Sequence, residues 1–137
     1  MISLKKIKSV KKLNNLSFYT INLQISYKMF DHYLYVSSTA KSFRDHFAKA
    51  AEQYIKEFNL NENSLVVDIG SNDGIALLPL KEKGIKVLGI EPAKNISEIA
   101  INNDIPTLNE YFTYNTVSKI EKKADIVTAS NVFAHAD

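Results

Sequence analysis

The sequence contains no cysteine. That absence excludes disulfides, cysteine-based zinc sites, iron–sulfur clusters and thiol catalysis. No apolar run approaches the roughly 18 residues that a membrane span needs. The net charge of +2 over 137 residues favours no particular class of partner. We expect no bound metal and no membrane partner.

A mass of 15.5 kDa, with 45% hydrophobic and 23% charged residues, indicates one domain with its own core. Residues 1–30 form a basic extension with six lysines and no acid, so this stretch carries +6 and the remainder −4. Apolar residues recur at helical spacing over residues 2–16 and alternate over residues 19–29, which predicts a helical or extended arm. A basic arm can contact nucleic acid, but a solvated extension is the favoured interpretation, so we expect no nucleic-acid partner.

From residue 42 onward, helical and strand patterns alternate. A helix is expected over residues 42–58, with Phe43, Phe47, Ala51, Tyr54, Ile55 and Phe58 on one face. Strands follow at 65–69, 86–90, 106–108 and 124–129. One intervening helix begins near residue 76 and stops at Gly84, and another is capped by Asn95 and Glu98. This order predicts an α/β fold: a right-handed, doubly wound, Rossmann-like parallel sheet, incomplete at about four strands.

The turn after the first of these strands carries the sequence V-D-I-G-S-N-D-G at residues 67–74. It lies beyond the carboxyl end of that strand, where open α/β sheets bind ligands. Gly70 permits a tight turn and a close approach of a ligand, and Gly74 does the same where the helix begins. On this motif alone, an ordinary glycine-containing turn is an equal alternative.

Glu91 ends the second strand 21 positions after Gly70, where a carboxylate can accept both hydroxyls of a ribose. Dinucleotide-binding and S-adenosylmethionine-binding domains share this spacing. In the G-x-G-x-x-G turn of dehydrogenases, the second glycine stands where this chain has Asn72. Asp68 places a carboxylate that suits a cationic ligand and repels a pyrophosphate. The methyltransferase interpretation is therefore favoured over a NAD(P)-binding oxidoreductase.

Four segments together resemble the class I S-adenosylmethionine-dependent methyltransferases, and among them the C-methyltransferases of nucleotide-linked keto-deoxysugars. They are S-N-D-G at 71–74, G-I-E-P at 89–92, I-P-T at 105–107 and N-V-F-A-H at 131–135. The resemblance extends back to about residue 23. It implies S-adenosylmethionine as cofactor and a nucleotide-linked sugar as small-molecule substrate.

The same resemblance implies roles for individual residues. The cofactor-binding set is Asp68, Gly70, Ser71, Asn72, Gly74, Glu91, Asn109 and Asn131, with Glu91 on the ribose, Asn109 near the adenine and Asn131 beside the methionyl end. His135 is the candidate catalytic residue, with a helix-capping or core-edge histidine as the alternative. Tyr33 and Tyr35 are candidates for the sugar side, and packing is the expected role of one of them.

The chain departs from that family in two ways. It lacks the cysteine-rich zinc module with which the family usually begins, and it ends at Asp137, before the further strands and the Tyr-x-Glu-His-like segment that supplies the base. We therefore expect residues 31–137 to be the N-terminal portion of a methyltransferase domain, inactive by itself and cytoplasmic. The open sheet edge would allow self-association. The non-enzymatic alternative is a Rossmann-like remnant that acts as a binding module.

Overall fold

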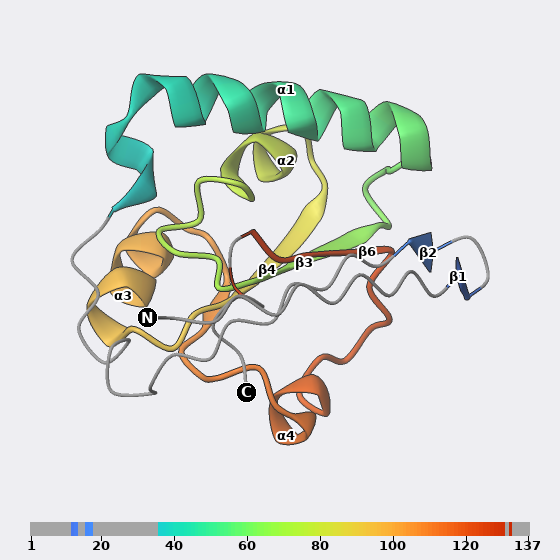
Figure 1. Cartoon of the computed structure of the whole chain (residues 1–137). Coiled ribbons are helices and arrows are strands. Elements are labelled where there is room, and N and C mark those ends of the chain that lie inside the picture. Colours follow the sequence, from blue (N-terminus) through green and yellow to red (C-terminus); the bar gives the residue numbers. More distant parts are fainter. Residues whose placement is uncertain (1–11, 14–15, 18–35, 131, 133–137) are drawn as a thin grey trace, which may run out of the picture.

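The computed structural model describes residues 12–13, 16–17, 36–130 and 132. A four-stranded sheet in the order β5-β4-β3-β6 lies at its centre (Figure 1). The strands are β3 (Leu65–Ile69), β4 (Lys86–Ile90), β5 (Thr107–Leu108) and β6 (Ile126–Thr128). All neighbouring strands run parallel. The predicted Rossmann-like α/β fold with about four strands is confirmed.

Strand β3 is the central strand of the sheet. Its Val66 pairs with Val87 of β4 on one side and Ile126 of β6 on the other. All five of its residues are buried, as a strand with paired edges and covered faces requires. The chain moves outward from β3 to β4 and β5, and then returns to place β6 on the opposite side of β3. The strand order thus reverses between β3 and β6, where open α/β sheets bind ligands.

Helix α1 precedes the sheet and lies across one face of it (Figure 1). It spans Lys41–Phe58 and stops at Asn59, which adopts a left-handed conformation with φ of 51°. Ala51 is buried, but Phe43 and Phe58 are 43% and 50% exposed. The predicted apolar face is therefore correct at the centre of the helix and wrong at its ends. An 18-residue helix is about 27 Å long, whereas a five-residue strand is about 17 Å long, so the helix ends extend past the sheet.

Two shorter helices follow β3 and β4. Helix α2 (Leu78–Glu82) carries Pro79 in its first turn, as expected. Helix α3 (Lys94–Asn102) begins two residues earlier than the sequence suggested, with Ala93 at its N-cap and no side-chain cap. The predicted capping pair of Asn95 and Glu98 is therefore wrong, because Asn95 lies inside the first turn. Glu98 instead forms an exposed ion pair with Lys94 at 3.8 Å.

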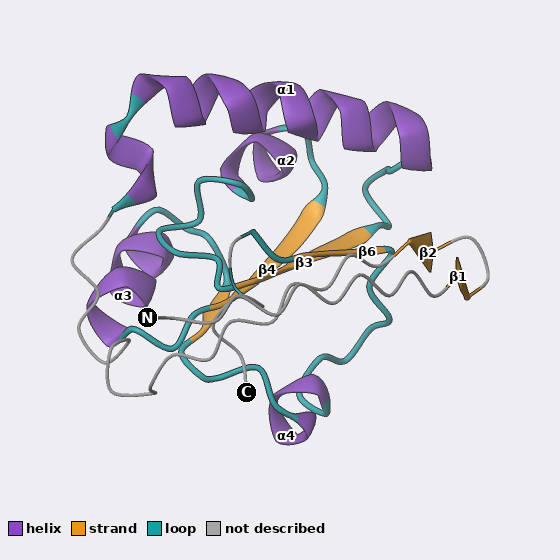
Figure 2. Ribbon diagram, viewed as in Figure 1, coloured by secondary structure: helices purple, strands orange, loops and turns teal. Residues whose placement is uncertain are grey.

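The two faces of the sheet have separate apolar clusters. Helices α1, α2 and α3 contribute Ala51, Leu80 and Ala100 to the cluster on one face. On the other face, Ile120 and Ala124 pack against Leu65, Val67 and Ile90. These two residues follow helix α4 (Tyr114–Val117), which lies below the sheet in Figure 2. The fold is thus layered on both faces.

The described pieces of the N-terminal arm are extended. Strands β1 (Lys12–Leu13) and β2 (Leu16–Ser17) pair antiparallel, so the helical spacing predicted for this part is wrong. The rest of the predicted arm lies outside the described residues. No helix in the described part of the chain is long and apolar enough to cross a membrane.

Candidate functional site

The turn after β3 folds back onto the end of β4. The backbone N–H groups of Gly70 and Ser71 both donate to the carbonyl of Ile90, at 2.7 and 3.2 Å. Gly70 has a φ of 65°, and a Cβ atom there would lie 2.3 Å from Val132 Cγ2. A larger residue would therefore be strained in its backbone and would clash with the segment after β6. This glycine brings three parts of the chain together at the carboxyl end of the sheet.

Glu91 is held against this turn by two backbone donors. Its Oε2 accepts the N–H of Asn72 at 2.9 Å, and its Oε1 accepts the N–H of Ala93 at 2.8 Å. The side chain is buried, with an exposure of 7% for the residue. Burial raises the pKa of Glu91, and the bonds from Ala93 and Asn72 oppose that rise. The carboxylate is thus fixed in orientation before any ligand arrives.

The acceptor sites that remain on the Glu91 carboxylate match a ribose. An ionised carboxylate offers about four acceptor sites, two on each oxygen. Each oxygen uses one site for a backbone N–H and retains one, which matches the two vicinal hydroxyls of a nucleoside. The structure therefore brings the predicted ribose acceptor and the glycine turn together, as the sequence indicated.

Asp68 lies at the point where the strand order reverses. It pairs in register with Thr128 of β6, and the Thr128 hydroxyl donates to Asp68 Oδ1 at 2.7 Å. Burial raises the pKa of Asp68 to about 6; the bond from Thr128 lowers it and the charge of Glu91 raises it further. The two carboxylates thus repel each other, and a cationic ligand nearby would relieve that repulsion.

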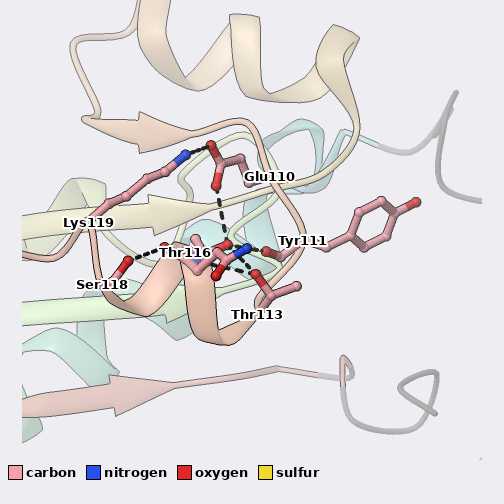
Figure 3. Close-up of polar contacts among 7 residues, drawn as sticks. Glu110, Tyr111, Thr113, Thr116, Ser118 and Lys119 are labelled. Carbon is pink, nitrogen blue, oxygen red and sulfur yellow. Dashed lines mark hydrogen bonds and ion pairs between the residues drawn. The ribbon is translucent and has the colours of Figure 1, made fainter.

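Asn109 connects the ends of β4 and β5. Its Nδ2 donates to the carbonyls of Glu91 and Pro92, both at 2.9 Å. The residues that follow are held in a polar network around Thr116, whose hydroxyl lies 3.2 Å from Glu110 Oε2 and 2.6 Å from the carbonyl of Tyr111 (Figure 3). Lys119 forms an ion pair with Glu110. These contacts fix the loop that carries Asn109 beside Glu91.

Ser71 faces inward. Its residue is 2% exposed, and within the described part of the chain its Oγ has no hydrogen-bond partner. It lies over Gly89 of β4, where a Cβ atom would approach Ser71 Oγ to 2.4 Å. Ser71 thus packs the turn onto the sheet.

The structure places seven of the predicted site residues around the carboxyl ends of β3, β4 and β5: Asp68, Gly70, Ser71, Asn72, Gly74, Glu91 and Asn109. The other four, Tyr33, Tyr35, Asn131 and His135, lie outside the described residues. Sequence reasoning missed Thr128 and Asp73. Thr128 could have been found as the polar residue ending the fourth strand, whereas the contact of Asp73 with Ser38, 35 positions away, leaves no local signal. Among the described residues, no group of three His, Asp or Glu is placed to hold a metal ion.

Several solved methyltransferases share this fold. A putative S-adenosylmethionine-dependent methyltransferase from Methanococcus maripaludis superposes with a TM-score of 0.57 at 18% identity, over 74% of this chain and 49% of that one. Magnesium protoporphyrin IX methyltransferase from Synechocystis, solved with bound S-adenosylmethionine, gives a TM-score of 0.54 at 17% identity, over 69% and 47%. The chain has the fold of the class I methyltransferases.

The sequence comparison points the same way. C-methyltransferase NovU from Streptomyces niveus is 32% identical over 110 residues, which cover 78% of this chain and 26% of NovU. The resemblance to class I S-adenosylmethionine-dependent methyltransferases is confirmed in sequence and in fold. The chain spans about a quarter of the length of NovU and about half of the solved structures. No family model matches it.

One curated relative has a different name. Thymidylate kinase from Finegoldia magna is 28% identical over 123 residues, which cover 89% of this chain and 54% of that protein. The turn of this chain, G-S-N-D-G, differs from the G-x-x-x-x-G-K-S/T loop that holds nucleotide phosphates in P-loop proteins. The kinase name therefore adds nothing to the interpretation of this site.

Proposed function

We propose that this chain binds S-adenosylmethionine and forms the cofactor-binding part of a methyltransferase. One observation carries the proposal: the Glu91 carboxylate is oriented by the N–H groups of Asn72 and Ala93 and retains an acceptor site on each oxygen. When bound, the cofactor would supply an electrophilic methyl group. Glu91 would hold its ribose, and the loop carrying Asn109 would lie near its adenine.

The charge of the site favours a cation over a dinucleotide. Asp68 and Glu91 repel each other, and a pyrophosphate would add further negative charge beside them. Asn72 sharpens this distinction. It adopts a left-handed conformation with φ of 51°, and it places a side chain where the G-x-G-x-x-G turn of a dehydrogenase has none.

For the reaction, we propose C-methylation of a nucleotide-linked keto-deoxysugar. The motif resemblance supports this class of substrate, and the name of NovU supports carbon as the acceptor. In this reaction a base would take the proton α to the ketone, and the bound cofactor would supply its methyl group to the resulting enolate carbon, with cleavage of the sulfur–methyl bond and release of S-adenosylhomocysteine. His135, Tyr33 and Tyr35 are proposed to contact the sugar, with His135 as the candidate catalytic residue of this chain.

Calorimetric titration tests the cofactor assignment. We expect S-adenosylhomocysteine to bind the chain more tightly than NAD, because it lacks the pyrophosphate. Tighter binding of NAD would contradict the proposal.

Transfer of labelled methyl by the whole protein tests the reaction. The substrates are a keto-deoxysugar nucleotide and its matched alcohol, which has no acidic α proton. We expect label on carbon from the ketone alone. Label on oxygen, or equal transfer to the alcohol, would exclude C-methylation.

A further inference from the structure

The short 3-10 turn η2 (Ser37–Thr39) lies against the glycine turn, although about 35 residues separate them in the chain. The Ser37 N–H donates to Asn72 Oδ1 at 3.0 Å, and the Ser38 N–H donates to Asp73 Oδ2 at 2.9 Å. Two adjacent side chains of the glycine turn thus hold two adjacent backbone donors. We call these two bonds the serine clamp.

Asn72 contacts both the serine clamp and the ribose acceptor. Its side chain accepts from Ser37, and its backbone N–H donates to Glu91 Oε2. Any shift of Asn72 therefore changes both contacts. The left-handed backbone explains why asparagine is accepted here, and the bond to Ser37 gives it a function that glycine could not perform.

Asp73 supplies the second bond of the clamp. The residue is 4% exposed, and among the described residues its Oδ1 has no hydrogen-bond partner. Among the described residues, the N–H of Ser38 is therefore the hydrogen-bond donor that this buried carboxyl group retains. Losing it would leave that group buried without any described partner.

The turn is also fixed to helix α1. The guanidinium group of Arg44 donates to the Ser38 carbonyl, and Thr39 Oγ1 donates to the Val36 carbonyl at 2.8 Å. The serine clamp therefore joins the glycine turn to a segment that is itself attached to the start of α1.

We propose that Asn72 and Asp73 are positioning residues, which couple the segment preceding α1 to occupancy of the Glu91 site. A nucleoside bound to Glu91 holds Asn72 in place and so tightens the serine clamp. Because coupling between two sites is reciprocal, weakening the clamp weakens ligand binding by the same factor. This inference rests on the proposed function, since S-adenosylhomocysteine is the ligand that reports the coupling.

Amide hydrogen exchange and calorimetry on the full chain test it. Asn72→Gly keeps the left-handed backbone and the N–H to Glu91 but removes the bond to Ser37. Asp73→Ala removes the bond to Ser38, and Asp73→Asn is the matched control that retains an acceptor oxygen. The amides of Val66 and Val67 in the central strand report whether each variant remains folded.

In the unmodified chain, we expect S-adenosylhomocysteine to slow exchange at Ser37 and Ser38 by about 5-fold or more. In Asn72→Gly and Asp73→Ala we expect this slowing to disappear and binding to weaken by a similar factor, with exchange at Val66 and Val67 unchanged. Asp73→Asn should retain most of both effects. Unchanged binding in the two clamp variants, or no ligand effect at Ser37 and Ser38, would overturn this inference alone. No binding by the unmodified chain would overturn the proposed function and this inference with it.

Discussion

Glu91 combines two tasks that are usually divided between residues. Its carboxylate accepts the N–H groups of Asn72 and Ala93, which satisfies donors at the turn and at the start of α3. The same oxygens are the proposed ribose acceptors. Since both backbone bonds fix the side chain in advance, ligand binding requires little further ordering of Glu91.

We predict that Glu91→Gln weakens S-adenosylhomocysteine binding by about 1.5–3 kcal/mol. The amide has one acceptor oxygen and one donor nitrogen, so one of the two backbone N–H groups would face a donor. Calorimetry measures the loss. Glu98→Gln, an exposed carboxylate on α3, is the control and should bind as the unmodified chain does. Equal affinity in Glu91→Gln would mean that the carboxylate does not contact the ligand.

The raised pKa of Asp68 predicts a pH-dependent stability. The folded pKa is about 6 and the ordinary value is 3.8, so the folded state holds the proton more tightly than the unfolded state does. The contribution of this proton to the free energy of unfolding is fully present below pH 3.8 and is lost as the pH rises through about 6. Burial also raises the pKa of Glu91, so its effect on stability has the same sign.

Asp68→Asn should therefore gain stability relative to the unmodified chain as the pH rises from 4 to 7. The full shift corresponds to at most about 3 kcal/mol. Urea unfolding at each pH measures the difference between the two proteins. Glu62→Gln removes an exposed carboxylate and should show no such trend. A constant difference between Asp68→Asn and the unmodified chain would show that Asp68 does not titrate in this range.

At the scale of the elements, the packing of the glycine turn onto strand β4 depends on one close contact, between Ser71 and Gly89. Gly89 leaves the space that the Ser71 side chain fills, and a Cβ atom at Gly89 would also approach Thr107 Oγ1 to 3.0 Å. The turn therefore lies as close to the sheet as backbone and one small side chain allow. That closeness lets Glu91, the residue directly after β4, reach the N–H of Asn72.

We predict that Gly89→Ala destabilises the fold by about 1–3 kcal/mol, because the turn must move outward. Ser71→Ala alone should cost little, since its hydroxyl is buried without a partner among the described residues. The double variant Gly89→Ala/Ser71→Ala should recover part of the loss, because the 2.4 Å contact is removed. Thermal or urea unfolding of all three compares them. Strictly additive effects would contradict the proposed clash.

The sequence predicted the elements better than their ends. Strands β3 and β4 were predicted at their observed bounds because each is a five-residue run rich in valine, isoleucine and leucine between turn residues, which is too short for a typical helix. The predicted start of α3 was wrong because Asn95 and Glu98 have the spacing of a capping box, while the N-cap lies two residues earlier at Ala93, whose N–H donates to Glu91. Glu91 and Ala93 are only two positions apart, but the other oxygen of Glu91 accepts from Asn72, 19 positions earlier, and that contact leaves no local signal.

At the scale of the whole molecule, the site residues that the sequence predicted are those with partners nearby in the chain, and the ones it missed have distant partners. Glu91 and the glycines were found because their spacing along one β-α-β unit is fixed. Thr128 and Asp73 were not, because their partners lie 60 and 35 positions away and depend on how the layers assemble. The contacts that join distant parts of the chain are therefore those for which the structure was needed.

The central position of β3 also has a consequence for the order of folding. Few residues of the chain separate Val66 from its β4 partner Val87, whereas 60 positions separate Asp68 from Thr128 of β6. Closing the longer loop costs about 1 kcal/mol more in chain entropy, so β3, β4 and β5 should associate first and β6 should dock last. Pulse-labelled hydrogen exchange during refolding should show Leu88 and Gly89 protected before Val127 and Thr128, and simultaneous protection would contradict this order. In this folding order, the junction of β3 and β6, where the strand order reverses, is the last part of the sheet to form. A newly made chain therefore acquires its ligand site only when folding is nearly complete.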